Sequence, residues 1–314
     1  MKPKVIVIVG PTASGKTALS IEVAKRIDGE IISCDSMQIY KDMDIGTAKV
    51  TKEEMQGIKH YLIDFVSPEE RYSVSNFKND SEKAIEKILK NKKVPIIVGG
   101  TGLYVDSLIY GIEYPKIEFD EEYRNELMQK AGTENGLEEL YKKAKEIDNE
   151  AMETISPNDK KRIIRVLEIF HATGINKTEQ ERLSRINGVK YDFKVFAINI
   201  DRQKLYERIN QRVDAMLEKG LVDEVKNLKQ KYNHFPTAMQ GLGYKEVVEF
   251  LEEEITYQEM VEKIKQETRR YAKRQLTWFR KNKQTIWIDA ENGIQSNSDI
   301  ILEVYKTWMN KKTN

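Results

Sequence analysis

Short apolar runs alternate with amphipathic segments in the first third of the chain. The apolar runs predict strands at Val5–Val9, Glu30–Cys34, Tyr61–Ile63 and Pro95–Val98. Apolar residues at helical spacing predict helices at Thr17–Ile27, at Asp80–Lys90 and from Leu103 onward. Because Val5–Val9 is apolar without interruption, we expect its strand to be covered on both faces. Strands that alternate with helices predict a parallel sheet with right-handed crossovers.

The pattern changes near Glu113. Runs of strand type disappear there and return only at Lys194–Ile200 and Thr285–Asp289. The intervening residues, Tyr114–Asp192, are charged and follow a helical period, most clearly in Asn158–Thr173, which has one apolar face. This contrast predicts a helical segment inserted into a sheet domain.

A phosphate-binding loop follows the first predicted strand directly. Residues Gly10-Pro-Thr-Ala-Ser-Gly-Lys-Thr17 match G-x-x-x-x-G-K-[ST] and stand between a strand and a helix, as this motif requires. Backbone N–H groups of the loop, the helix N-terminus and the Lys16 ammonium together favour a diphosphate or a triphosphate such as ATP. Thr17 is placed to hold Mg²⁺, directly or through water. The loop does not define which phosphate compound is bound.

The motif and the element order together predict an α/β fold. We expect a P-loop NTPase-like parallel sheet with flanking helices, formed by residues 1–112 and 193–314. An all-helical domain is expected at residues 113–192. The second half of the core adds predicted helices at Asp201–Lys219 and at about Tyr257–Lys281.

Composition narrows the class of protein. Of 314 residues, 39% are hydrophobic and 33% are charged, an ordinary globular balance. No apolar run approaches the ~20 residues of a membrane-spanning helix. The single cysteine, Cys34, excludes a disulfide within the chain. Because the chain begins directly with a strand, we expect no signal peptide, and the simplest expectation is a cytoplasmic monomer without a membrane partner.

The net charge of +1 conceals a strongly basic segment. Between Lys263 and Lys283 the chain has nine lysines and arginines but one acidic residue, Glu267. Acidic stretches such as Glu252–Glu254 balance this charge elsewhere. A polyanion responds to the local field, so the segment is a candidate nucleic-acid-binding surface. Its interleaved aromatic residues either pack into the core or contact RNA.

Ligands of an open parallel sheet bind beyond the carboxyl ends of its strands. Asp35 ends the second predicted strand, and the topology brings it near the phosphate loop. Three roles are open: a carboxylate that holds Mg²⁺ through water, a general base for an incoming nucleophile, or a cap of the next helix. Asp64 ends the third strand, where a structural role is favoured. We expect the Cys34 thiol to be buried in its strand.

Two further features lie at strand ends or on one helical face. Gly99-Gly-Thr-Gly102 is a glycine turn that either lets backbone approach a ligand or allows close packing, and Thr101 within it is a candidate polar contact. Arg208 and Arg212 lie four residues apart, so they either converge on one anion or form a solvated face. The three histidines show no metal-ligand spacing.

Five stretches carry a more specific signal. They are Gly10–Thr17; Asp35-Ser-Met-Gln-Ile-Tyr40 with Asp44-Ile-Gly-Thr-Ala-Lys49; Val98-Gly-Gly-Thr-Gly-Leu-Tyr104; Pro157-Asn-Asp-Lys-Lys-Arg-Ile-Ile-Arg-Val-Leu-Glu168; and Gln240-Gly-Leu-Gly-Tyr-Lys245 with Thr268-Arg-Arg-Tyr-Ala-Lys-Arg-Gln-Leu-Thr-Trp-Phe-Arg280. In this order, over nearly the whole chain, they resemble the bacterial-type tRNA dimethylallyltransferases, also called tRNA isopentenyltransferases or the IPP transferase family. Because the chain ends soon after the last predicted strand, we expect the zinc finger of eukaryotic members to be absent.

The resemblance implies a reaction and roles for residues. A dimethylallyl group would move from dimethylallyl diphosphate to the exocyclic amine of the adenine just 3′ of the tRNA anticodon, with Asp35 accepting a proton and Mg²⁺ at Thr17. The implied catalytic residues are Asp35, Lys16, Thr17, Arg208 and Arg212, with Arg208 favoured over Arg212 for the diphosphate contact. The loop residues expected at the diphosphate are Gly10, Pro11, Thr12, Ala13, Ser14, Gly15, Lys16 and Thr17. The residues implied to line the path of the anticodon stem-loop are Asp35, Ser36, Met37, Gln38, Thr101, Arg124, Lys161, Arg162, Arg165, Gln240, Gly241, Gly243, Tyr244, Lys245, Lys273, Arg274, Gln275, Trp278 and Arg280.

Three other functions are kept as alternatives. A prenyltransferase for free adenine nucleotides, as in cytokinin synthesis, would need neither the basic segment nor the inserted domain. A P-loop small-molecule kinase would use Arg162 and Arg165 as lid arginines, but the ordered motifs argue against it. An RNA-binding module switched by a nucleotide would perform no chemistry.

Overall fold

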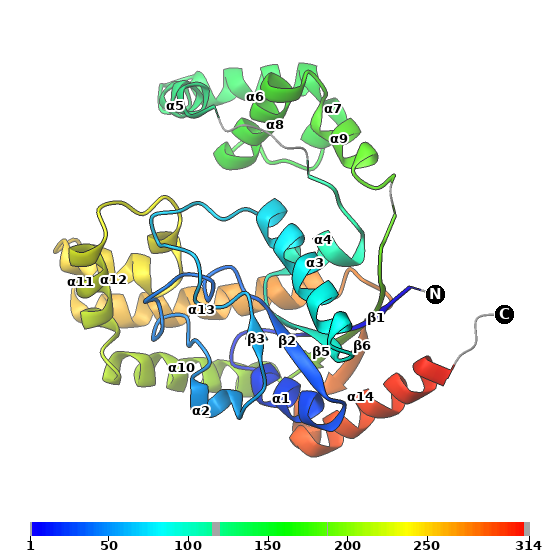
Figure 1. The fold of residues 1–314 in the computed structure, drawn as a ribbon. Coiled ribbons are helices and arrows are strands. Elements are labelled where there is room, and N and C mark those ends of the chain that lie inside the picture. The colour runs from blue at the N-terminus through cyan, green and yellow to red at the C-terminus, as the bar shows by residue number, and fades with distance from the viewer. Residues whose placement is uncertain (1, 115–119, 187, 311–314) are drawn as a thin grey trace. The chain divides into compact units, whose positions relative to one another are not determined.

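The computed structural model describes residues 2–114, 120–186 and 188–310. Figure 1 shows its helices and strands. In chain order they are β1 (Lys4–Val9), α1 (Lys16–Arg26), β2 (Gly29–Cys34), α2 (Lys52–Met55), β3 (His60–Tyr61), α3 (Val74–Lys90), β4 (Val94–Gly99), α4 (Gly102–Ile109), α5 (Glu121–Lys130), α6 (Gly136–Ile147), α7 (Asn149–Met152), α8 (Lys160–Thr173), α9 (Lys177–Leu183), β5 (Asp192–Asn199), α10 (Arg202–Glu218), α11 (Leu221–Lys231), the 3₁₀ turn η1 (Ala238–Gln240), α12 (Tyr244–Leu251), α13 (Tyr257–Phe279), β6 (Ile286–Asp289), the 3₁₀ turn η2 (Ala290–Asn292) and α14 (Gly293–Asn310).

The strands form one parallel sheet of six strands in the order β3-β2-β4-β1-β5-β6. The register aligns Val9 with Gly99 and Ala197, and Gly99 with Cys34. The carboxyl ends of β1, β2, β4 and β5 therefore meet at one edge. The loops that follow these strands gather at that edge, which confirms the predicted parallel α/β fold.

Helices cover both faces of the sheet. Val5, Val7 and Val9 of β1 face a core layer that includes side chains of α3, α4 and α13, whereas Ile6 and Ile8 face α1 and α14. Side chains alternate between faces along a strand, so the uninterrupted apolar sequence of β1 has a partner on each side. The expectation that this strand is covered on both faces is confirmed.

Three elements differ from the sequence-based expectation. Helix α3 starts at Val74 and not at Asp80, because Ser73 and Asn76 form a reciprocal capping box at its N-terminus. Strand β3 is limited to His60–Tyr61, and Ile63 lies outside it. Helix α14 was not predicted; it packs against α1 and completes the second core layer. Its apolar residues are buried only when the folded chain brings α14 against α1.

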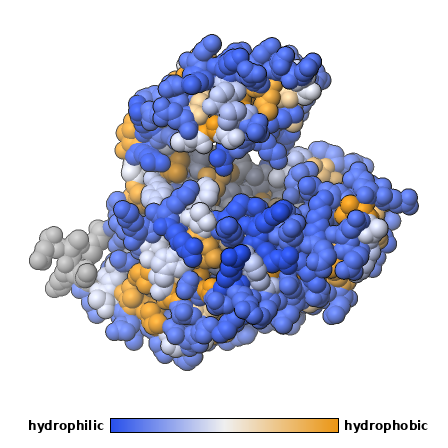
Figure 2. All heavy atoms as spheres, turned by 180° about the vertical axis from the view of Figure 1, so that it is seen from behind, coloured by the Kyte–Doolittle hydropathy of each residue, from blue (hydrophilic) through white to orange (hydrophobic). Residues whose placement is uncertain are grey.

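The chain divides into two compact units, one formed by Met1–Ile109 with Lys190–Asn314 and the other by Tyr110–Val189. The second unit is helical, and its core consists of buried residues from α5 to α8 such as Leu127, Leu140 and Ile164. Of the residues predicted to be helical there, 115–119 and 187 lie outside the described part. In the described residues no helix has the length and hydropathy needed to cross a membrane. Most of the surface seen in Figure 2 is hydrophilic, with smaller hydrophobic patches.

Candidate active site

The phosphate loop has two residues in the left-handed region of backbone conformation. Ala13 and Gly15 both adopt positive φ, 61° and 89°, and Gly15 is the N-cap residue of α1. Because positive φ strains a residue with a side chain, Ala13 is held by the loop around it. The Lys16 ammonium donates to the Pro11 carbonyl oxygen at 3.1 Å, so the side chain folds back over the loop. The loop and the first turn of α1 therefore enclose a place for an anion.

One loop amide already has a partner inside the protein. The Thr12 N–H donates to Gln275 Oε1 at 2.9 Å, and Gln275 Nε2 donates to the Gly100 carbonyl oxygen at 3.0 Å. Gln275 is 5% exposed. Its amide therefore joins the phosphate loop to the second glycine turn. The structure gives Gln275 this internal role, and the tRNA contact expected from the resemblance stays a prediction.

The electrostatics of the loop are dominated by burial of positive charge. Burial, and after it the neighbouring Arg212, lower the pKa of Lys16 to about 8, while Asp35 acts in the opposite direction. Burial also lowers the pKa of Arg212, again opposed by Asp35. Two partly buried cations beside one carboxylate leave an excess of positive charge. Such a site favours a ligand with more than one negative charge.

Asp35 lies where β2 ends and caps a turn. Its Oδ1 accepts hydrogen bonds from the N–H groups of Met37 at 2.9 Å and Gln38 at 3.3 Å. No helix follows directly, so of the three roles left open from sequence the helix cap is excluded, and the carboxylate caps a turn. Oδ2 takes no part in these bonds. The turn fixes the carboxylate in the cavity described below and leaves an oxygen that can accept a proton.

The second glycine turn is explained by close packing. A Cβ at Gly99 would lie 2.0 Å from the Cys34 carbonyl oxygen, and one at Gly102 would lie 2.4 Å from the Trp278 ring. The Thr101 hydroxyl accepts from the Ser36 N–H at 3.1 Å. Thr101 thus ties this turn to the turn that Asp35 begins. Of the two alternatives left open from sequence, close packing accounts for Gly99 and Gly102. Approach of this backbone to a ligand stays a prediction.

A cavity of about 390 Å³ opens beside these groups, within the unit that contains the sheet. Predicted site residues that line it are Thr12, Lys16, Thr17, Asp35, Ser36, Met37, Gln38, Arg212, Gln240, Gly241, Gly243, Tyr244, Arg274 and Gln275. Lining residues that the sequence did not single out for the site include Ser33, Thr47, Ala48, His60, Met216, Thr268 and Tyr271. Burial, and after it the charge of Asp35, raise the pKa of Tyr271, which keeps its hydroxyl protonated.

Arg212 and Arg208 lie in different surroundings. Arg212 lines the cavity, and its Nη2 donates to the Thr47 carbonyl oxygen at 3.3 Å. Arg208 is exposed and does not line the cavity. The geometry therefore favours Arg212 for an anion contact, opposite to the preference expected from sequence. The sequence could not distinguish the two arginines, because they lie four residues apart and so share one face of α10.

Some predicted tRNA-contacting residues have partners inside the protein. Tyr244 is 1% exposed and its hydroxyl donates to Glu224 at 2.6 Å. The Trp278 indole N–H donates to Asp106 at 2.9 Å, and the ring packs on Gly102. In the helical unit, Arg124 forms an ion pair with the buried Glu168 at 2.7 Å. These contacts give the three side chains partners inside the protein, and their contact with tRNA stays a prediction.

The basic segment separates into paired and unpaired cations. Carboxylates pair with its N-terminal part: Glu249 with Lys263, Asp214 with Lys265, and Glu267 with Arg270. Within the described residues, Lys273, Arg274 and Arg280 form no ion pair and are exposed. Thr101, Lys245, Lys273, Trp278 and Arg280 do not line the cavity. A charged surface therefore remains at the C-terminal half of α13.

The helical unit carries its own exposed cations. Lys161, Arg162 and Arg165 are exposed on α8. Arg162 pairs with Asp159 at 3.2 Å and Arg165 with Glu168 at 3.5 Å, whereas Lys161 has no ion pair in the described structure. Surface pairs of this kind add little stability, so these side chains stay available to an external anion.

A parallel sheet that brings a phosphate loop, a strand-end carboxylate and two partly buried cations to one cavity defines a class of protein. It is an α/β P-loop protein whose cavity has an excess of positive charge. A family model described as IPP transferase matches residues 38–282. The chain belongs to the IPP transferase family.

Individual relatives agree with this assignment. A tRNA dimethylallyltransferase of Acetivibrio thermocellus is 53% identical over 91% of this chain and 92% of its own length. One of Thermoanaerobacter sp. is 52% identical over 89% and 90%. Solved structures include a tRNA isopentenylpyrophosphate transferase of Bacillus halodurans, with a TM-score of 0.71 and 40% identity over 96% of both chains. A eukaryotic dimethylallyltransferase acting on tRNA gives a TM-score of 0.78 at 32% identity, covering 92% of this chain and 74% of the other.

Proposed function

We propose that this protein transfers a dimethylallyl group from dimethylallyl diphosphate to the exocyclic amine of the adenine just 3′ of the anticodon in tRNA. The observation that carries the proposal is one cavity that unites Lys16, Arg212 and Asp35 in a chain of the IPP transferase family. The names of the relatives, tRNA dimethylallyltransferase, support the reaction class. Diphosphate is the second product.

The donor side of the reaction needs charge stabilisation. As the bond between the allylic carbon and the diphosphate oxygen breaks, negative charge grows on the leaving diphosphate. The phosphate loop amides, Lys16 and Arg212 face this charge. Their positions are fixed before the reaction, so little reorganisation is needed when the charge develops. The Thr12 N–H does not contribute, because Gln275 already accepts its hydrogen bond.

Magnesium is the expected cofactor, and Thr17 is the residue that would contact it. Thr17 is exposed in the first turn of α1 and lines the cavity beside Lys16. The described residues contain no cluster of three or more His, Cys, Asp or Glu that could hold a metal ion by themselves. This suits Mg²⁺, which binds through few protein ligands together with substrate phosphates and water. When bound, Mg²⁺ would neutralise part of the diphosphate charge.

The acceptor side needs a base. The amine of adenine is a weak nucleophile because its lone pair is delocalised into the ring. Asp35 would accept the amine proton as the new bond to carbon forms, which gives a balanced substitution. The target adenine has to leave its stack to reach a cavity inside the protein.

Binding of tRNA would use exposed cations on both units. On α13 these are Lys273, Arg274 and Arg280, and on α8 Lys161, Arg162 and Arg165. Contacts of this kind position the RNA through its phosphates and carry no sequence information by themselves. As an enzyme of tRNA, the protein would work in the cytoplasm, and we propose that it acts as a monomer.

The test is mass spectrometry after incubation with dimethylallyl diphosphate and Mg²⁺. Parallel reactions contain tRNA, AMP or ATP, and Asp35→Asn serves as the inactive control. A gain of about 68 Da on tRNA, the mass of one dimethylallyl group in place of hydrogen, supports the proposal. A gain on AMP or ATP in place of tRNA would select the adenine-nucleotide prenyltransferase. Transfer of phosphate would select a kinase, and binding of tRNA without any modification would select a binding module.

A further inference from the structure

The segment Asp44–Lys49 lines the cavity with its residues Gly46, Thr47 and Ala48 but bears no group that the proposed reaction uses. It is a tight turn, closed by hydrogen bonds from Ala48 N–H to the Ile45 oxygen and from Lys49 N–H to the Asp44 oxygen, both at 2.9 Å. Ala48 has a positive φ of 43°. Such a backbone conformation persists only where surrounding contacts hold it.

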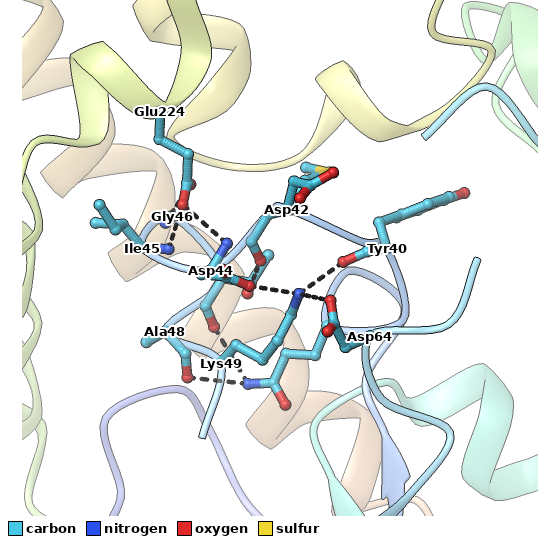
Figure 3. A network of polar contacts seen from close by, with 12 residues as sticks. Tyr40, Asp42, Asp44, Ile45, Gly46, Ala48, Lys49, Asp64 and Glu224 are labelled. Atoms are coloured by element: carbon cyan, nitrogen blue, oxygen red, sulfur yellow. Dashed lines mark hydrogen bonds and ion pairs between the residues drawn. The ribbon is translucent and has the colours of Figure 1, made fainter. Parts of the chain in front are cut away.

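One carboxylate binds the start of this turn. Glu224 Oε2 accepts from Asp44 N–H at 2.9 Å and from Ile45 N–H at 2.7 Å, and Oε1 accepts from Gly46 N–H at 3.1 Å. Figure 3 shows the side chain of Glu224 reaching these three residues. The Tyr244 hydroxyl adds a fourth bond, at 2.6 Å. Successive N–H groups around a carboxylate form an anion-binding concavity, here occupied by the protein's own side chain.

A buried lysine holds the other end of the turn. Lys49 Nζ lies 2.6 Å from Asp44 Oδ1 and 2.7 Å from Asp64 Oδ1, and it donates to the Tyr40 oxygen at 2.7 Å (Figure 3). The Lys49 side chain is 7% exposed. Asp64, which the sequence placed at a strand end, thus has a structural role, as favoured. Both ends of the turn are fixed by ionised groups.

The middle of the turn contacts two residues of the proposed reaction site. The Thr47 carbonyl oxygen accepts from Arg212 Nη2 at 3.3 Å and from Gln38 Nε2 at 3.2 Å, and the Ala48 carbonyl oxygen accepts from Gln38 Nε2 at 3.2 Å. Gln38 belongs to the turn that Asp35 caps. The Asp44–Lys49 turn therefore touches both the cation that faces the leaving group and the turn that holds the base.

We propose that Glu224 is a positioning residue: by binding the amides of Asp44–Gly46 it fixes the Thr47 carbonyl and through it orients Arg212 toward the diphosphate. This inference rests on the proposed function. Glu224 itself does not line the cavity, so its effect has to pass through the turn. Tyr244 supports the same carboxylate, which explains why a tyrosine of a conspicuous sequence motif is buried.

The test uses Glu224→Gln. A glutamine offers one acceptor oxygen and an NH₂ group, so it cannot accept from all of these donors and opposes a donor to at least one of them. The turn should loosen, and Arg212 should lose its fixed partner. We expect roughly tenfold weaker binding of an unreactive thiodiphosphate analogue of the donor, the scale of one misplaced charge-assisted contact. Because Arg212 acts at the leaving group, kcat should fall as well.

Asp223→Asn is the matched control. Asp223 precedes Glu224 in the first turn of α11, where both acids favour the helix dipole, but its side chain is 77% exposed. It should bind the analogue like the wild type. A double-mutant cycle with Arg212→Ala then separates positioning from general destabilisation. If Glu224 acts through Arg212, Glu224→Gln should cause little further loss of analogue affinity once Arg212 is alanine.

Amide hydrogen exchange supplies a second measurement that needs no ligand. The amides of residues 44–46 should exchange slowly in the wild type and in Asp223→Asn, and faster in Glu224→Gln. Unchanged exchange, or additive losses in the cycle, would overturn the inference. If the wild type itself does not bind the analogue, the proposed function fails. The inference is then tested by hydrogen exchange alone. Faster exchange in Glu224→Gln at the amides of residues 44–46 and also of Thr47 would support it, and faster exchange at 44–46 without any change at Thr47 would overturn it.

Discussion

The Gln275 side chain accepts a hydrogen bond from the Thr12 N–H at 2.9 Å, across 263 positions of sequence. The same amide donates to the Gly100 carbonyl oxygen. A Cβ at Gly100 would lie 2.1 Å from Gln275 Nε2, so glycine is required for this contact. Helix α13 is thereby tied to both glycine loops of the site, while the neighbouring Lys273 and Arg274 are exposed and Arg274 also lines the cavity.

Gln275→Met should lower the free energy of unfolding by about 1–3 kcal/mol, because the Thr12 N–H and the Gly100 oxygen lose their buried partner. It should also weaken diphosphate binding, since the phosphate loop loses a contact. Urea unfolding and analogue titration measure the two effects. Gln266→Met is the matched control, because Gln266 is exposed on the same helix. Equal stability of the two variants would show that the bridge contributes nothing.

Affinity for the diphosphate analogue should fall as the pH rises above about 8. Burial, and then Arg212, lower the pKa of Lys16 to about 8, so the free protein loses this charge above that pH. A bound diphosphate would raise the pKa of Lys16, so binding takes up a proton and weakens by up to about tenfold per pH unit. Titrations of the wild type and of Lys16→Met over this pH range measure the effect. A slope that survives in Lys16→Met belongs to another group.

Folding stability should change in the opposite direction over the same range. The folded-state pKa of Lys16 lies below its ordinary value of 10.5, so between about pH 8 and 10.5 the unfolded chain binds more protons than the folded one. The contribution of Lys16 to the free energy of unfolding therefore rises with pH in that window. Below pH 8 both states are protonated, and the folded state bears the full penalty of the buried charge.

Asp35→Asn should retain binding of both substrates and lose roughly 10²–10⁴-fold in kcat, the usual contribution of a general base. The asparagine Oδ1 can still accept from the Met37 and Gln38 amides, so the turn should persist. Single-turnover rates at saturating tRNA and dimethylallyl diphosphate test this. Normal turnover at saturation together with poor diphosphate binding would instead assign Asp35 to the metal.

Arg212→Ala should weaken binding of the diphosphate analogue by roughly tenfold or more, because Arg212 lines the cavity. Arg208→Ala is the matched variant four residues earlier on α10, and its exposed side chain should matter less. Removal of Arg212 should also raise the pKa of Lys16, since Arg212 is one of the groups that lower it. Isothermal titration of both variants decides the matter; a larger loss for Arg208→Ala would reverse the assignment.

The Lys273→Ala, Arg274→Ala double variant should bind tRNA with a shallower salt dependence. Each cation that meets a phosphate contributes up to about one unit to the log–log slope, so the slope should drop by up to about two. Lys263→Ala, Lys265→Ala is the control, because Glu249 and Asp214 already pair with these lysines. Turnover at saturating tRNA should stay close to wild type for the control. An identical slope in the two double variants would place the RNA on another surface.

The sequence by itself determined the features that depend on neighbours in the chain. The uninterrupted apolar run Val5–Val9 required cover on both faces, and the G-x-x-x-x-G-K-[ST] motif set the turn into α1. Asp35 was placed at the site because parallel strands share one carboxyl edge. The ordered motifs also identified the family. Each of these inferences needs only local spacing or a topological rule.

Tertiary structure alone decided which of several similar residues face the site. Arg208 and Arg212 share a helical face, and only the packing of α10 puts Arg212 in the cavity. Gln275, Tyr244 and Trp278 stand in motifs that suggested RNA contacts, and each also has a hydrogen-bond partner on another element of the fold. For the same physical reason, the sequence predicted neither helix α14 nor the contact of Glu224 with the amides of Asp44–Gly46. Burial and hydrogen-bond partners over long sequence separations depend on how complete elements pack, and no periodicity or short motif encodes that geometry.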